Sequence, residues 1–119
     1  MSTRRRRIDV EPGYDSLLSV FVLALEESQH GKGKQRHANN QPFINQDICQ
    51  ITRDVGHGFT RGQAIKKIRE AQRLTPKAAE IREILGALNY LAADVIVLIE
   101  EAEQDGAPFR AAYTEPHEA

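Results

Sequence analysis

The chain has 119 residues, of which 40% are hydrophobic and 28% charged, the size and composition of one globular domain. Only 6% are aromatic and Trp is absent, so the core must be built from aliphatic residues, which favours helices over a β-sandwich or barrel. The single cysteine, Cys49, excludes an internal disulfide and fits a reducing cytosol. No apolar run approaches the roughly 20 residues of a membrane span. We therefore expect a cytoplasmic protein that does not contact membranes.

The formal net charge of −1 conceals an asymmetry along the chain. Residues 1–73 carry 13 Lys and Arg against 8 Asp and Glu, whereas residues 74–119 carry 3 against 9. A basic part joined to an acidic part indicates a surface for anions or polar self-association. Two solvated faces of opposite charge explain the same pattern.

The first predicted elements are a basic arm and a helix. Residues 1–13 are expected to form a flexible arm, because Pro12-Gly13 follows four consecutive arginines. Residues 14–30 show the three-four spacing of a helix, with Asp15 as its N-cap and Gly31 at its end.

Two further helices are expected at residues 45–56 and from Thr60 onward. Thr60 and Gln63 match a capping box, in which a hydroxyl and an amide side chain satisfy the first backbone amides of a helix. The residues expected to face inward are Ile48, Ile51, Thr52, Val55, Ala64, Ile65, Ile68, Ala71 and Gln72.

The last predicted helix is long. It starts with Thr75 as N-cap and Pro76 at the first position, and it ends near Gln104. Its apolar residues form two stripes, which predicts burial from two sides. At 1.5 Å per residue it would be roughly 40 Å long and would extend beyond its own domain. We therefore expect an all-α bundle of about four helices over residues 14–106, an oligomer through its last helix, and a loose tail at 107–119.

The loop after the first helix is rich in cations and glycine. Glycines allow backbone amides to approach a ligand, and Lys and Arg side chains bind phosphate oxygens. The loop lacks the spacing of a Walker A sequence, and no strand precedes it as in a dinucleotide fingerprint. It is either a solvated basic loop or an anion site, formed by Lys32, Lys34, Arg36 and His37.

The helix that begins at Thr60 adds a second group of cations. Three of them are spaced by three and four residues and share one face, and the free amides at the helix start also attract anions. The candidate ligand-binding residues on this helix are Arg61, Lys66, Arg69 and Arg73, with Phe43, Phe59 or Tyr90 as a stacking surface for a base. A solvated basic face is the alternative.

The four histidines and Cys49 lack the spacing of metal ligands, so we expect no metal site. No pairing of a nucleophile with a histidine follows from position alone. We therefore expect no cofactor and identify no catalytic residue.

The segments Ile68–Leu74 and Glu83–Leu91 resemble the paired-helix core of the all-α MazG-like nucleoside triphosphate pyrophosphohydrolases. The resemblance covers at most about a third of the chain, and it implies a helical hairpin whose carboxylates hold Mg²⁺ on a triphosphate. Glu70 is retained, whereas Arg69, Arg73 and Ala87 stand where the family has carboxylates. Because Mg²⁺ needs oxygen ligands, the resemblance implies a relative without catalytic metal whose arginines contact phosphates directly.

The size and helical character also resemble those of small phage accessory proteins, some of which sequester nucleotide second messengers of host immunity. Our leading hypothesis is non-catalytic binding of a phosphate-bearing small ligand, which we take to be a nucleotide. One alternative is a DNA- or RNA-binding regulator with a helix-turn-helix and the arginine arm. The others are a protein–protein adaptor and a Mg²⁺-dependent pyrophosphohydrolase that uses Glu70, Glu80, Glu83 and Asp94.

Overall fold

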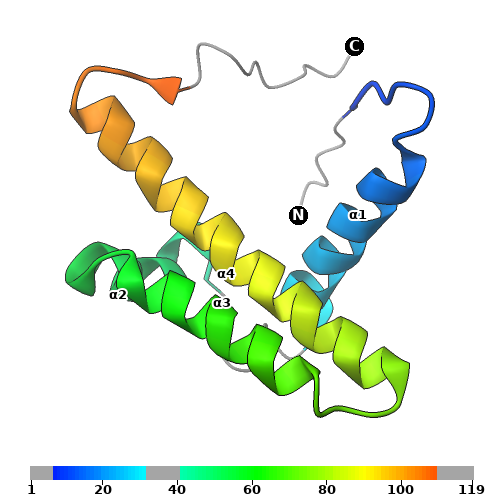
Figure 1. Ribbon diagram of the computed structural model, residues 1–119. Helices are drawn as coiled ribbons and strands as arrows, with labels where there is room; N and C mark the ends of the chain where they lie inside the picture. The colour runs from blue at the N-terminus through cyan, green and yellow to red at the C-terminus, as the bar shows by residue number, and fades with distance from the viewer. Residues whose placement is uncertain (1–6, 32–40, 110–119) are drawn as a thin grey trace.

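The computed structural model describes residues 7–31 and 41–109, and within these ranges the chain contains helices and no strand (Figure 1). The predicted all-α class, with four helices and a long last one, is confirmed. The elements in chain order are α1 (Asp15–His30), a 3₁₀ turn η2 (Phe43–Asn45), α2 (Asp47–Val55), α3 (Gly58–Ala71) and α4 (Lys77–Gln104). None of these helices combines the length and the apolar run needed to cross a bilayer.

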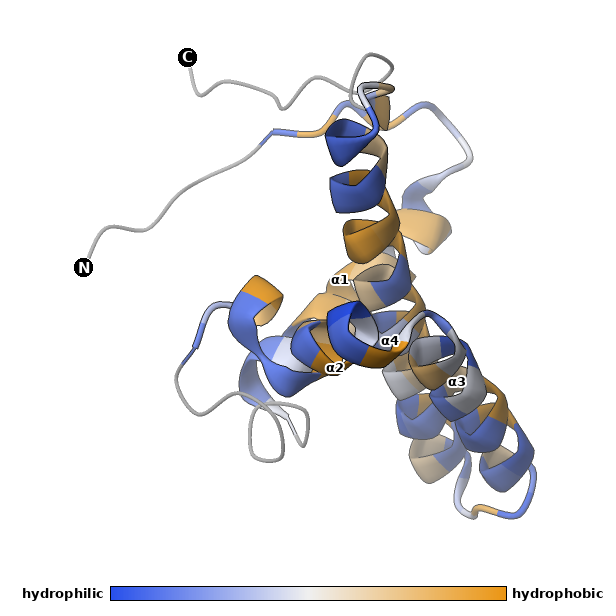
Figure 2. Ribbon diagram, turned by 90° about the vertical axis from the view of Figure 1, so that its left-hand side faces the viewer, coloured by the Kyte–Doolittle hydropathy of each residue, from blue (hydrophilic) through white to orange (hydrophobic). Residues whose placement is uncertain are grey.

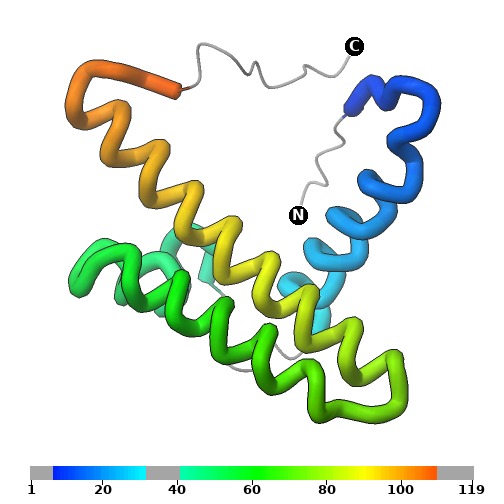
Figure 3. The backbone as a smooth tube through the Cα atoms, viewed as in Figure 1, coloured from blue at the N-terminus to red at the C-terminus, as the bar shows by residue number. Residues whose placement is uncertain are grey.

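The core lies where α3, α4 and α2 meet. The helices α3 and α4 run antiparallel and side by side (Figures 1 and 3), joined by a short turn. Small side chains fill their contact, which lets the two helices approach closely. The buried residues of the core are Ile48 and Cys49 from α2, Ala64 from α3, and Ala87, Tyr90, Ala93 and Val97 from α4.

Several inward-facing predictions are wrong. On α3, Ala64 and Ala71 are buried as expected, but Ile65 and Ile68 are exposed, and so is Val55 at the end of α2. The α3–α4 contact is made by alanines, so the bulkier isoleucines of α3 point away from it.

The predicted helix caps are also wrong. α3 begins at Gly58, so Thr60 lies inside its first turn and is buried. The Thr60 hydroxyl lies 3.1 Å from the backbone oxygen of His57 and 3.1 Å from Asp94 Oδ1, so it serves a buried carboxylate instead of a capping box. Asp15 is the first residue of α1 and does not cap it. Pro76, not Thr75, precedes α4.

α1 touches the rest of the described chain through a short stretch near its C-terminal end. Ala24 is its only buried residue, and the Asn89 Nδ2 of α4 donates a hydrogen bond of 2.9 Å to the Ala24 backbone oxygen. From this contact the two helices diverge (Figure 1), so Leu17 and Phe21 remain more than half exposed. In Figure 2, orange hydrophobic segments likewise continue along the part of α4 that extends past α2 and α3.

We expect Val97→Ala to lower the free energy of unfolding by about 2 kcal/mol, because the smaller side chain leaves a cavity in the core. Val97 is only 1% exposed. The matched control is Val55→Ala, at a position that is 70% exposed, where we expect a change within about 0.5 kcal/mol. Urea denaturation followed by circular dichroism measures both. Equal losses in the two variants would contradict the assignment of the core.

Candidate functional site

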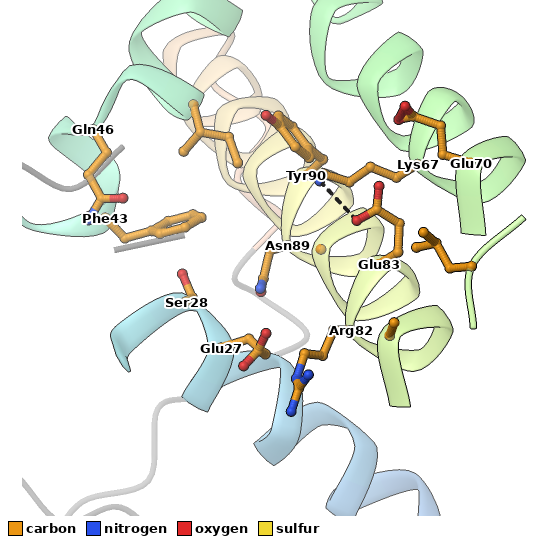
Figure 4. Close-up of a pocket in the computed structure, with 14 residues that line it drawn as sticks. Glu27, Ser28, Phe43, Gln46, Lys67, Glu70, Arg82, Glu83, Asn89 and Tyr90 are labelled. Atoms are coloured by element: carbon orange, nitrogen blue, oxygen red, sulfur yellow. Dashed lines mark ion pairs between the residues drawn. The ribbon is translucent and has the colours of Figure 1, made fainter. Parts of the chain in front are cut away.

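A pocket of about 320 Å³ lies where the C-terminal end of α1 meets α3, α4 and the segment around η2 (Figure 4). Helices α3 and α4 supply most of its walls, while Glu27 and Ser28 come from α1 and Phe43 from η2. Residues from all five elements, including Ile48 of α2, therefore line one space. This convergence makes the pocket the first candidate for a binding site.

One end of the pocket is aromatic. The rings of Phe43 and Tyr90 line it beside Ile48. Tyr90 is held from behind by Phe59, whose ring meets it edge-to-face with centroids 6.0 Å apart and an interplanar angle of 77°. Because aromatic rings offer flat apolar surfaces, this end suits the face of a planar ligand group. Two of the three stacking candidates from the sequence, Phe43 and Tyr90, thus line the pocket.

Charged side chains line the rest of the pocket, and Lys67 of α3 brings a cation beside the Tyr90 ring. Its Nζ lies 3.8 Å from Glu83 Oε1 and 5.8 Å from the centroid of the Tyr90 ring. Gly86 makes this position possible, since a Cβ there would lie 3.2 Å from Lys67 Cδ and 3.3 Å from Cε. The absence of a side chain on Gly86 therefore lets the lysine stem cross α4 toward the pocket.

Arg82 adds a second cation, and Glu27, Glu70 and Glu83 add carboxylates (Figure 4). The pocket thus offers both charged donors and charged acceptors. An anionic group finds its partners in Lys67 and Arg82, and hydroxyl or amino groups of the same ligand find acceptors in the glutamates.

Three of the predicted ligand-binding residues lie on α3 and a fourth, Arg73, lies just after it, and none of the four lines the pocket. Arg61 is bound at the other end of the hairpin, with its Nε 3.0 Å from Asp94 Oδ2. Lys66, Arg69 and Arg73 are exposed. The neighbouring Lys67 points inward instead, since Lys66 and Arg69 lie on another face of the helix and Arg73 follows its end. Lys32, Lys34, Arg36 and His37 lie outside the described residues.

The sequence reasoning missed Lys67, Arg82, Glu27, Gln46 and Asn89 as lining residues. One signal for Lys67 was present. It lies three residues after Ala64 and four before Ala71, so it shares the face of the two alanines that pack on α4. For Arg82 and Asn89 no local pattern distinguished them from other polar residues of a long helix.

The four carboxylates of the pyrophosphohydrolase alternative do not converge. Glu70 and Glu83 line the pocket, but Glu80 lies 3.3 Å from Lys77 Nζ on the same helix, and Asp94 binds residues at the start of α3. Among the described residues, no three His, Cys, Asp or Glu side chains are grouped so that they could hold a metal ion. The donor set does not fit the Mg²⁺ of that family, and we derive no step through it.

A second polar cluster surrounds Asp94, which is 6% exposed. Its carboxylate accepts hydrogen bonds from Arg61 Nε and from His57 Nδ1, and Thr60 Oγ1 lies 3.1 Å from its Oδ1. His57 Nε2 in turn lies 2.8 Å from Glu101 Oε1. Arg53 and Glu100 form a bidentate ion pair nearby, in which Nε and Nη2 of Arg53 each donate a hydrogen bond of 2.9 Å to one carboxylate oxygen. These contacts join the end of α2, the loop before α3 and the first turn of α3 to the C-terminal half of α4.

The charged groups of this cluster raise the pKa of His57 and lower the pKa of Asp94. Glu101, and then Asp94, raise the pKa of His57 because both accept hydrogen bonds from its protonated ring. Burial alone raises the pKa of Asp94, but the hydrogen bonds from Arg61, His57 and Thr60 outweigh it, and the pKa of Asp94 is lowered. Asp94 and Glu101 each face one ring nitrogen of His57, an arrangement that suits the protonated ring, in which both nitrogens donate. We call the cluster of His57, Thr60, Arg61, Asp94 and Glu101 the Asp94 clamp.

The clamp predicts a dependence of stability on pH. The folded chain holds the His57 proton more tightly than the unfolded chain does. This contribution is therefore complete below the unfolded pKa of about 6.5 and is lost as the pH rises through the higher folded pKa. The Asp94 contribution is present above about pH 3.9 and is lost as the pH falls through its lowered pKa. Urea denaturation at a series of pH values measures both slopes.

The variant His57→Gln should remove the loss of stability above pH 6.5 and retain the loss in acid. The matched control is His30→Gln, since the His30 side chain is 69% exposed. Its pH profile should match that of the unchanged chain. A His57→Gln profile that still falls above pH 6.5 would show that another group causes the slope.

The chain matches no protein-family model, no curated protein and no solved structure. Its resemblance to the MazG-like helical hairpin therefore stays a prediction from two sequence segments. The pocket between α1, α3 and α4 and the Asp94 clamp are the features of the described chain from which a function can be proposed.

Proposed function

We propose that the protein binds a nucleotide in the pocket between α1, α3 and α4, without a catalytic step. One observation carries this proposal. The same pocket is lined by the Phe43 and Tyr90 rings and by the Lys67 and Arg82 cations, with Lys67 Nζ 5.8 Å from the centroid of the Tyr90 ring. A nucleotide combines the same two requirements, a planar base and an anionic phosphate.

The base is assigned to the aromatic end. Stacking on an aromatic ring contributes about 1–3 kcal/mol per base in nucleic-acid complexes. Gln46 stands beside Phe43, and its Nε2 already donates to the Gln41 backbone oxygen at 2.9 Å. Its amide oxygen is left to accept a hydrogen bond from an amino group of the base.

The phosphate is assigned to Lys67 and Arg82. The 3.8 Å separation between Lys67 Nζ and Glu83 Oε1 is longer than a hydrogen bond, so the ammonium group keeps donors for a ligand. Arg82 presents the planar fork that binds phosphate oxygens in pairs. The carboxylates of Glu27 and Glu70 then accept hydrogen bonds from the ribose hydroxyls.

The volume indicates the size of the ligand. A pocket of about 320 Å³ is at the lower end of the range of about 300–1,000 Å³ for small-molecule sites. It suits one nucleotide better than two.

Isothermal titration with nucleoside mono-, di- and triphosphates, each with Mg²⁺ and with EDTA, tests the proposal. We expect binding of at least one of these classes in EDTA. Lys67→Met should weaken that binding about 10- to 100-fold, the effect of losing one charged hydrogen bond of about 1.5–3 kcal/mol. The matched control is Lys66→Met, which removes the adjacent cation outside the pocket and should leave the affinity unchanged.

Two outcomes would overturn the proposal. Equal losses in Lys67→Met and Lys66→Met would place the ligand on the outer face of α3. Release of phosphate or pyrophosphate from a bound triphosphate in Mg²⁺ would show that the protein is an enzyme. A short DNA duplex is the comparison ligand, since nucleic-acid binding falls steeply with salt and binding of one nucleotide does not.

A further inference from the structure

One long stripe of α4 is apolar and uncovered in the described chain. The residues Ile81, Ile84, Leu88, Leu91, Val95, Leu98 and Ala102, here called the α4 seam, alternate by three and four positions. This is the spacing with which two helices pack along a common seam. The five largest exposed residues of the seam are between 38% and 53% accessible, namely Ile81, Ile84, Leu91, Val95 and Leu98. The other side of α4 carries the core.

α1 presents a second apolar face beside the seam. Leu17, Val20 and Phe21 lie seven, four and three residues before Ala24, so they share the helix face with which Ala24 touches α4. They are exposed only because the two helices diverge beyond that contact (Figure 1). The angle between α1 and α4 is therefore apolar on both sides.

The exposed apolar area on α1 and α4 is close to the area that one partner buries in a protein–protein interface. The large exposed hydrophobic residues of the seam, together with Leu17, Val20 and Phe21 of α1, amount to on the order of 700 Å², compared with about 800 Å² that each partner buries in a standard stable complex. The segments 1–6, 32–40 and 110–119 are mostly polar, with Met1 and Tyr113 as their only large apolar residues. The printed sequence thus contains no apolar segment that could cover this face from within the chain.

We propose that a second copy of this chain covers the face, with its α4 antiparallel to the first along the α4 seam and in the angle between α1 and α4. A copy of the same chain brings an equal and complementary seam, as twofold symmetry requires. In the antiparallel arrangement Leu91, near the middle of the seam, lies close to the symmetry axis. Ile84 then lies opposite Leu98 of the second copy.

The charges favour the antiparallel direction. The exposed cations Lys66 and Arg69 lie on the part of α3 that packs beside the N-terminal half of α4, as the Lys67–Glu83 contact shows, and the exposed Arg73 follows just after α3. The exposed acids at the other end of α4 are Glu101, Glu103 and Asp105. An antiparallel copy brings the acidic end of each chain to the basic end of the other, whereas a parallel copy places like charges together.

Sedimentation equilibrium of the full chain is the first test. We expect a mass of two copies, or an even multiple, of the 13.4 kDa chain. Leu91→Glu places a charge near the axis and should give the mass of one copy with an unchanged helical spectrum. The control is Val55→Glu, an equally polar change at an exposed position of α2 outside the seam, which should keep the wild-type mass. A wild-type chain that stays monomeric up to about 100 μM overturns the proposal.

Disulfide cross-linking tests the direction. Ile84→Cys and Leu98→Cys are prepared as separate variants with distinguishable tags, and Cys49 is retained because it is fully buried. Under mild oxidation the mixture should give a heterodimer, while each variant alone should give little product. The reverse pattern, with efficient homodimers and no heterodimer, indicates a parallel seam and overturns the proposal. If no cross-link forms in the mixture or in either variant alone, another surface forms the interface, and the proposal is overturned as well.

A variant that aggregates would leave the first test open for that position, so Leu98→Glu serves as a second disruption of the seam. It should also give the mass of one copy. Neither test depends on nucleotide binding, since both are made without ligand. The assembly and the proposed function can therefore fail separately.

Discussion

Asp94 accepts hydrogen bonds from groups at the beginning of α3, and these bonds set the register of the α3–α4 hairpin. A buried carboxylate without partners is destabilising by several kcal/mol, so sliding the helices past each other carries that penalty. Arg61, near the start of α3, binds Asp94 of α4. With the register set there, Lys67 lies beside Glu83 and Gly86, nearer the turn between the two helices. The clamp at one end of the hairpin thereby positions the cation at the other.

The sequence predicted the helices better than their orientation. The spacing of apolar residues predicted α1 and the end of α4 to within a residue, because these depend on local periodicity and on the Gly and Pro that follow. The face of α3 depends on its neighbour. Ile65 and Ile68 are large and apolar and therefore predict an inward face, whereas the close contact with α4 is made by Ala64 and Ala71. Lys66 is predicted from its spacing with Arg69 and Arg73, whereas Lys67 lines the pocket.

The sequence predicts that the last helix is buried from two sides. One side of α4 is buried against α2 and α3, but through Ala87, Tyr90, Ala93 and Val97, which belong to neither predicted stripe. The stripe that contains Ile84, Leu91 and Leu98 is exposed in the described chain. Periodicity shows that a face is apolar, but it does not show which molecule covers it. The oligomer predicted from the length of the helix is therefore a proposal about a second copy.

The proposed interface and the proposed pocket share α1. Glu27 and Ser28 line the pocket at the C-terminal end of this helix, and Leu17, Val20 and Phe21 lie toward its other end. Within the described chain, α1 is fastened to α4 chiefly around Ala24 and Asn89. A second copy seated on the apolar face would fix the direction of α1 and with it the position of Glu27. By linkage, a ligand that binds the pocket in that arrangement would strengthen the association to the same degree. Assembly and ligand binding would then both depend on the orientation of α1.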